Sequence, residues 1–169
     1  YLLLSNTREY IIQTSITKGK STMIKHPFNR KWYNKYDQSA KETLRDHLVK
    51  IGHEVNDIEE DYNVDVVSTK NGYTYYSEAE VKTAWKDEWP TSFTEIRVPE
   101  RKKRLIEMYK KDKGVLNFYV FSKDLSKAWR IKDTQMTPDR LKEAKGRNIR
   151  AGEKFFHIPY TEAELVEIK

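Results

Sequence analysis

Three residues of the types that phosphodiester hydrolysis requires stand near one another in the sequence: Asp65, Glu80 and Lys82. This reaction needs an attacking water, positive charge against the phosphate and help for the departing oxygen. A Mg²⁺ ion held by carboxylates can supply all three, and a nearby lysine can orient or deprotonate the water. Two carboxylates and a lysine on adjoining strands would therefore indicate metal-dependent hydrolysis of a phosphodiester.

Two predicted strands, at residues 64–69 and 73–85, have to bring these residues together. The Asn-Gly dipeptide between them is the strongest short signal for a β-hairpin. Because successive side chains of a strand point to opposite faces, Asp65 is expected on the face opposite to its two valine neighbours. Glu80 and Lys82 share one face for the same reason. If the hairpin pairs the two strands, all three side chains can converge on one side of a sheet.

The Glu-x-Lys spacing means little by itself in a chain of which 34% is charged. The same spacing recurs at residues 100–102, 143–145 and 167–169. These copies fall at a predicted helix start, in a predicted polar helix and at the C-terminal end. Only residues 80–82 lie in a predicted strand that follows a hairpin and an Asp-bearing strand. The structural context, and not the triplet, therefore gives this copy its specificity.

Helices are predicted on either side of the hairpin. The first spans residues 39–51, with Ser39 and Glu42 spaced as a capping box and an apolar stripe at Ala40, Leu44, Leu48 and Ile51. The second begins at Pro99 and runs to residue 111. The remaining predicted elements are strands at 115–121, 129–131 and 155–160 and a polar helix from 138 to 145. This order predicts an α/β fold, with a mixed central sheet flanked by helices.

Residues 39–121 resemble the PD-(D/E)xK nuclease superfamily, whose fold is restriction-endonuclease-like. The resemblance is carried by Asp65 and by the triplet of Glu80 and Lys82, with Val64 where many members have proline. It implies a core in the order α-β-β-β-α-β and Mg²⁺-dependent cleavage of DNA, less often RNA. It also implies Asp65 and Glu80 as metal ligands and Lys82 as the catalytic lysine.

A glutamate on the opening helix of this family also reaches the metal, which makes Glu42 a candidate catalytic residue and third metal ligand. The alternative is a structural role, because Glu42 is the capping-box partner of Ser39. Both interpretations stay open at the level of sequence. Glu78 has the same strand parity as Glu80 and is a further acidic candidate, against the simpler alternative that it faces water.

The net charge of +6 and the sequence pI of about 9.3 favour a polyanionic partner. A basic cluster follows the Glu80 strand and is the candidate nucleic-acid-binding surface, against the simpler alternative of a solvated helix face. Its members are Arg97, Arg101, Lys102, Arg104 and, in the preceding loop, Lys86. Basic stretches at residues 30–33 and 142–150 are weaker candidates.

Several classes of protein are excluded or disfavoured. The absence of cysteine excludes disulfides, iron–sulfur clusters and cysteine zinc sites, and is consistent with an intracellular (cytoplasmic) location. No apolar run is long enough to cross a bilayer, and no glycine-rich nucleotide loop is present, so neither a membrane nor a nucleotide cofactor is expected. Residues 1–25 are predicted to be an appendage, and residues 26–169 a single nuclease domain.

The sequence therefore predicts a metal-dependent endonuclease that hydrolyses DNA phosphodiester bonds with Mg²⁺, for which Mn²⁺ can substitute. Family analogy adds a homodimer in which each subunit cuts one strand. Roles in a phage, a mobile element, restriction or repair would all fit. The alternatives are a catalytically inactive nuclease-fold module that binds DNA or RNA, and a basic, aromatic-rich protein-interaction domain.

Overall fold

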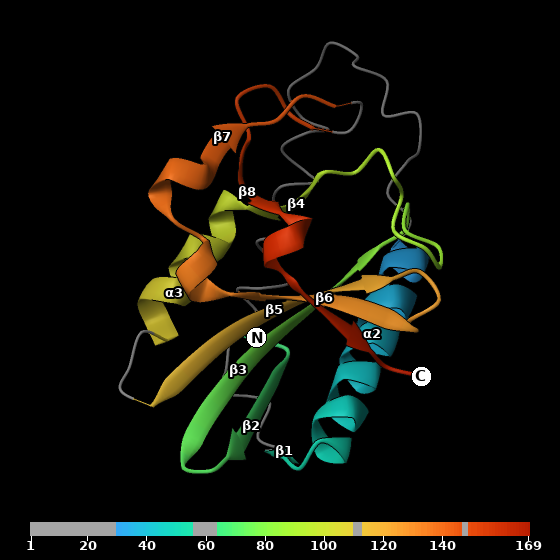
Figure 1. Ribbon diagram of the computed structural model, residues 1–169, viewed down its shortest axis with the longest axis vertical. Helices are drawn as coiled ribbons and strands as arrows, with labels where there is room; N and C mark the ends of the chain where they lie inside the picture. Colours follow the sequence, from blue (N-terminus) through green and yellow to red (C-terminus); the bar gives the residue numbers. More distant parts are fainter. Residues whose placement is uncertain (1–29, 56–63, 110–112, 147–148) are drawn as a thin grey trace.

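A six-stranded sheet forms the centre of the computed structural model, which describes residues 30–55, 64–109, 113–146 and 149–169, with side chains from residue 35 onward (Figure 1). Neighbouring strands are antiparallel except for β3 and β5, which are parallel. The strands in spatial order are β1 (Glu54–Val55), β2 (Val66–Lys70), β3 (Tyr73–Lys82), β5 (Gly114–Ser122), β6 (Lys127–Lys132) and β9 (Glu164–Glu167). The predicted α/β class with a mixed sheet is confirmed.

The predicted hairpin is present between β2 and β3. Lys70 pairs with Tyr73 across a two-residue turn of Asn71 and Gly72. Both turn residues have positive φ, +52° and +79°, which is the backbone that a type I′ turn requires and that asparagine and glycine adopt most readily. This turn fixes the register in which β2 ends and β3 continues.

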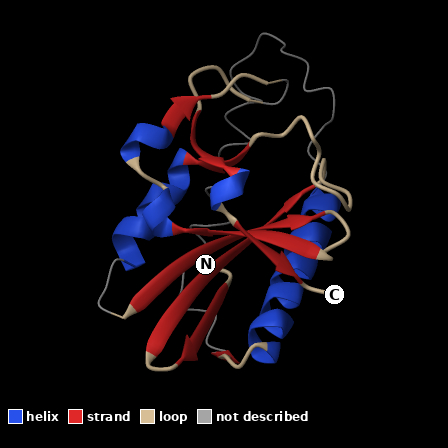
Figure 2. Ribbon diagram, viewed as in Figure 1, coloured by secondary structure: helices blue, strands red, loops and turns tan. Residues whose placement is uncertain are grey.

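Helix α2 (Arg30–Lys50) covers one face of the sheet (Figure 2). Its fully buried Leu44 and Leu48 pack against Val66 of β2 and Ala79 of β3, so this part of the predicted apolar stripe faces the core. Ile51 does not belong to it, because the helix ends at Lys50 and Ile51 is 40% exposed. The helix begins at Arg30, well before the predicted start. The capping box is therefore wrong, because Ser39 lies in the helix interior, where backbone N–H groups already have partners in the preceding turn.

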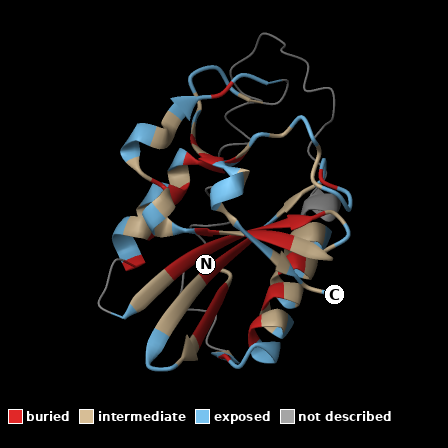
Figure 3. Ribbon diagram, viewed as in Figure 1, coloured by how far each residue is buried: buried red, intermediate tan, exposed pale blue. Residues whose placement is uncertain are grey.

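The opposite face of the sheet carries two smaller elements. The first is a turn, η1 (Glu100–Lys102), that leads into helix α3 (Lys103–Tyr109) and so connects β3 to the parallel β5. The second is a three-stranded antiparallel sheet of β4 (Glu95–Pro99), β8 (Lys154–Pro159) and β7 (Leu141–Glu143). Buried residues lie along the central strands of the sheet and in parts of these elements (Figure 3). The central sheet therefore packs against helix α2 on one face and against these elements on the other.

Several sequence predictions need correction. The polar helix predicted from 138 to 145 is a short turn, η3 (Pro138–Arg140), followed by β7, because that segment pairs with β8 and Leu141 packs on the core. Strands β4 and β9 were not predicted. Two more short turns, η2 (Asp133–Gln135) and η4 (Tyr160–Glu162), complete the described elements. The appendage predicted at residues 1–25 lies outside the described residues. None of the described helices is long and apolar enough to span a bilayer.

Candidate active site

Four alternate residues of β3 face away from helix α2. They are Tyr76, Glu78, Glu80 and Lys82. The intervening Ala79 and Val81 pack with the α2 side of the core, so strand alternation directs their neighbours to the other face. The predicted sharing of one face by Glu80 and Lys82 therefore agrees with the packing.

These four side chains differ in how far they are covered. Tyr76 stacks on Tyr109 of α3 with ring centroids 4.1 Å apart. Glu78 is only 3% exposed. Lys82 is half-buried, and its Nζ lies 4.8 Å from the centroid of the Phe93 ring. Glu80, between Glu78 and Lys82, is exposed. Solvent therefore reaches this face of β3 at Glu80, with covered residues on either side.

Asp65 lies just before β2 and contacts β3 directly. Its Oδ2 accepts a hydrogen bond of 2.9 Å from the backbone N–H of Ala79. Pairing between β2 and β3 ends at Ser77, so the carboxylate replaces a strand as acceptor for this N–H. Asp65 therefore approaches β3 from its edge, one residue from Glu80. The prediction that Asp65 points to one face of a strand does not hold, because β2 starts only at Val66 and Asp65 precedes it.

The environment of Lys82 makes its amine easier to deprotonate than that of an ordinary lysine. Burial is the main cause that lowers the pKa of its amine below the ordinary value, and the nearby charge of Arg97 lowers it further. The Glu80 carboxylate acts in the opposite direction. An amine that loses its proton more easily than an ordinary lysine is suited to orient or deprotonate a water molecule.

The carboxylates fit a divalent ion with few protein ligands. Among the described residues, no group of three or more His, Asp or Glu side chains is placed to hold a metal. Magnesium nevertheless commonly binds to one or two carboxylates, with water and substrate phosphate as its other ligands. Asp65 and Glu80 are the candidates for such an ion, because the Asp65 carboxylate is hydrogen-bonded to the residue next to Glu80 and the Glu80 side chain is exposed.

Glu42 is not brought to this pair. It is exposed on α2, where its Oε1 accepts a hydrogen bond of 3.0 Å from Gln38. Helix α2 packs on the face of the sheet opposite to Glu80, because Leu44 contacts the Ala79 side of β3. We therefore correct the ligand set that the sequence predicted and leave Glu42 out of the candidate site.

The predicted basic side chains differ in exposure, and one of them is buried. Lys102 is 5% exposed, and its Nζ lies 3.3 Å from Oε2 of Glu78, so the predicted phosphate contact is corrected to a buried ion pair. Arg97 and Lys86 are exposed, and Arg101 and Arg104 are partly exposed.

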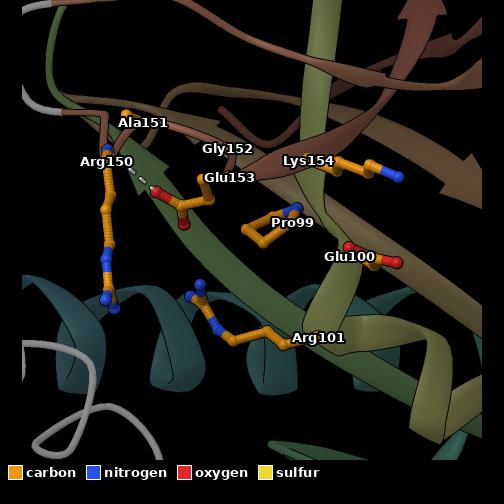
Figure 4. A pocket seen from close by; sticks show the side chains of 8 residues that line it. All are labelled: Pro99, Glu100, Arg101, Arg150, Ala151, Gly152, Glu153 and Lys154. Carbon is orange, nitrogen blue, oxygen red and sulfur yellow. Dashed lines mark hydrogen bonds between the residues drawn. The ribbon is translucent and has the colours of Figure 1, made fainter.

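A hollow of about 550 Å³ lies beyond Pro99, at the end of β4. Arg101 and Arg150 both line it, and Figure 4 shows their guanidinium groups in the same part of the hollow. Glu153 caps the neighbouring turn by accepting a hydrogen bond of 3.3 Å from the Arg150 backbone N–H. Two guanidinium groups that line one hollow favour an anion there.

Three neighbours of the site were missed by sequence reasoning. The ring of Phe93 covers the amine of Lys82. Oε1 of Glu95, on β4, forms a hydrogen bond of 2.7 Å with Nδ1 of His157 and lies 3.9 Å from Nε of Arg97. His157 belongs to no paired histidine motif of the sequence. Pairing of β4 with β8 places it beside Glu95, and no local spacing signals a contact between residues so far apart in sequence.

No protein-family model matches the sequence, and no curated protein matches it.

Proposed function

We propose that this protein is a metal-dependent endonuclease that hydrolyses DNA phosphodiester bonds. One observation carries the proposal: Glu80 and Lys82 share a face of β3, and the carboxylate of Asp65 is fixed to the same strand at Ala79. The combination supplies two carboxylates and an amine of lowered pKa next to solvent. Those are the groups that hydrolysis of a phosphodiester with a divalent ion requires.

The arrangement of elements supports a restriction-endonuclease-like core. Helix α2 precedes the antiparallel strands β1, β2 and β3, and α3 then connects β3 to a parallel β5. This agrees with the α-β-β-β-α-β order that the PD-(D/E)xK resemblance implies.

Each residue has a task in the proposed reaction. Asp65 and Glu80 would hold Mg²⁺ or Mn²⁺, which when bound polarises the phosphate and lowers the charge on the departing oxygen. Lys82 orients the attacking water and takes up its proton. Arg97 and Arg101 bind backbone phosphates beside the site, and the net charge of +6 strengthens that attraction at low salt.

Cleavage of plasmid DNA in Mg²⁺, Mn²⁺ and EDTA tests the proposal. We expect nicking with either metal, none in EDTA, and at least a roughly hundredfold slower reaction for Asp65→Asn and Glu80→Gln. Glu143→Gln is the matched control, because Glu143 belongs to another Glu-x-Lys triplet and is exposed. Salt-sensitive DNA binding without cleavage would instead favour the inactive, nucleic-acid-binding alternative. Equal rates for the wild type and all three variants would refute the assignment.

A further inference from the structure

An aromatic pocket of about 270 Å³ lies between residues 83–94, which connect β3 to β4, and strands β6 and β9. Its walls include Trp89, Phe93, Trp129 and Tyr160, with Lys127 and Leu165 at its edge. The volume lies just below the range of roughly 300–1,000 Å³ typical of drug-sized ligands. The pocket therefore suits one small flat ring system.

The walls of this pocket are held in place by the protein. Trp89 stands almost perpendicular to Trp129, at 85° with ring centroids 5.6 Å apart, and makes a similar edge contact with Phe93 at 5.5 Å. Nε1 of Trp89 donates a hydrogen bond of 2.8 Å to the carbonyl oxygen of Phe93. The ring of Trp89 is thus fixed without a ligand, so little ordering would be needed when one binds.

The pocket adjoins the candidate active site. Phe93 lines the pocket, and the same ring lies 4.8 Å from Nζ of Lys82. A ligand in the pocket is therefore separated by a single phenyl ring from the amine that would face the scissile phosphate. On the other side, Lys127 brings a positive charge to the edge, although Glu88 pairs with it at 2.9 Å.

We propose that this pocket binds one unpaired nucleobase of the DNA strand that is cut. The inference rests on the proposed nuclease function, because it places the phosphate of the same strand at Lys82. A base has the flat π-face that stacks on aromatic walls, and stacking of this kind tolerates any sequence. A base inside a duplex cannot enter, so the ligand is a single-stranded end, a flap or a flipped nucleotide.

Binding without metal tests this proposal separately from catalysis. In EDTA, the affinity of the protein is measured for a duplex with one unpaired nucleotide and for the same duplex with an abasic residue at that position. We expect the unpaired base to raise the affinity about tenfold. In Leu165→Glu, whose substitution places a carboxylate at the edge of the pocket, this advantage is lost. Val49→Glu adds the same charge at an exposed residue of α2 and keeps it.

Two results would overturn the proposal: equal affinity of the wild type for the two duplexes, or an undiminished advantage in Leu165→Glu. Leu165 is 45% exposed, so its substitution leaves the core intact, and circular dichroism checks that the variant folds. Cleavage of DNA together with equal affinity for the two duplexes would refute the role of the pocket but not the nuclease assignment. Base discrimination without cleavage in Mg²⁺ would refute the nuclease assignment alone.

Discussion

Replacing Lys102 by methionine is predicted to destabilise the protein strongly, although the sequence places this residue in a run of surface-like basic residues. Methionine keeps most of the length and volume of lysine but removes the ammonium group. The change leaves Glu78 in place, with a side chain only 4% exposed and a carboxylate that has lost the ammonium group 3.3 Å away. Loss of charge compensation, and not loss of packing, therefore decides the outcome.

The magnitude follows from the geometry of this pair. At 3.3 Å and an effective dielectric constant of about 20, the attraction between two unit charges is about 5 kcal/mol. Removal of one partner of a buried pair usually costs about 3–5 kcal/mol, because the other charge remains uncompensated. We therefore expect a free energy of unfolding lower by about 3–4 kcal/mol.

Urea denaturation followed by tryptophan fluorescence measures this loss. With a slope of about 2 kcal/mol per molar urea, the midpoint should fall by roughly 1.5–2 M. Lys103→Met is the matched control, because Lys103 is exposed and its loss should change stability by less than about 0.5 kcal/mol. Adding Glu78→Gln to Lys102→Met should restore at least half of the loss. A Lys102→Met midpoint equal to that of the control would refute the reasoning.

Three further predictions concern packing, pH and DNA binding. Leu44→Ala should lower the free energy of unfolding by about 2–5 kcal/mol in urea, because Leu44 is fully buried against the sheet; a loss below 0.5 kcal/mol would contradict that packing. Burial is the main cause that lowers the pKa of His53 below 6.5, with the charges of Lys70 and His47 contributing. The unfolded chain therefore takes up this proton first, and stability should fall as pH drops from about 6.5 through the lowered pKa. In His53→Gln, the free energy of unfolding should change less between pH 7 and pH 5 than in the wild type. An equal change in both proteins would contradict this role of His53. Arg101→Ala should lower the salt dependence of duplex binding by about 0.9 in log K against log salt, and an identical slope would remove Arg101 from the interface.

Local signals predicted the part of the site that lies on the hairpin. The turn could be predicted because Asn71 and Gly72 easily adopt the positive φ that it requires. Strand alternation then fixed the common face of Glu80 and Lys82. These inferences worked because each depends only on neighbours within a few residues. The approach of Asp65 to the edge of β3 was not predictable in the same way, because it depends on where β2 starts.

The second sheet could not be predicted, because its strands meet through long-range pairing. Ile96 and Val98 alternate with polar residues as a strand requires, but their partners are Ile158 and Phe156 of β8. Without that pairing, no pattern places Arg97 beside Lys82. A second pairing, of β7 with the other edge of β8, makes the segment at Leu141 a strand instead of the predicted helix.

The helical spacing of Lys102 indicated that it is buried, although its charge favoured an assignment to the surface. Lys102 precedes Leu105 by three positions and Tyr109 by seven, which is the spacing of one helix face, and both of these residues are buried. A lysine in that stripe requires a buried carboxylate, and Glu78 provides it. A charged residue that occupies a core position of a helical stripe is therefore a candidate for a buried ion pair and should not be assigned to the surface by its charge alone.

The most direct test of the nuclease assignment is the single-turnover rate at which an end-labelled DNA is cut in Mg²⁺ by the wild type and by Lys82→Met. Lys169→Met is the control, because Lys169 is the exposed lysine of another Glu-x-Lys triplet. We predict a rate for Lys82→Met that is lower by a factor of about 10²–10⁴, with the control equal to the wild type. Equal rates for Lys82→Met and the wild type would contradict the proposed role of the β3 face.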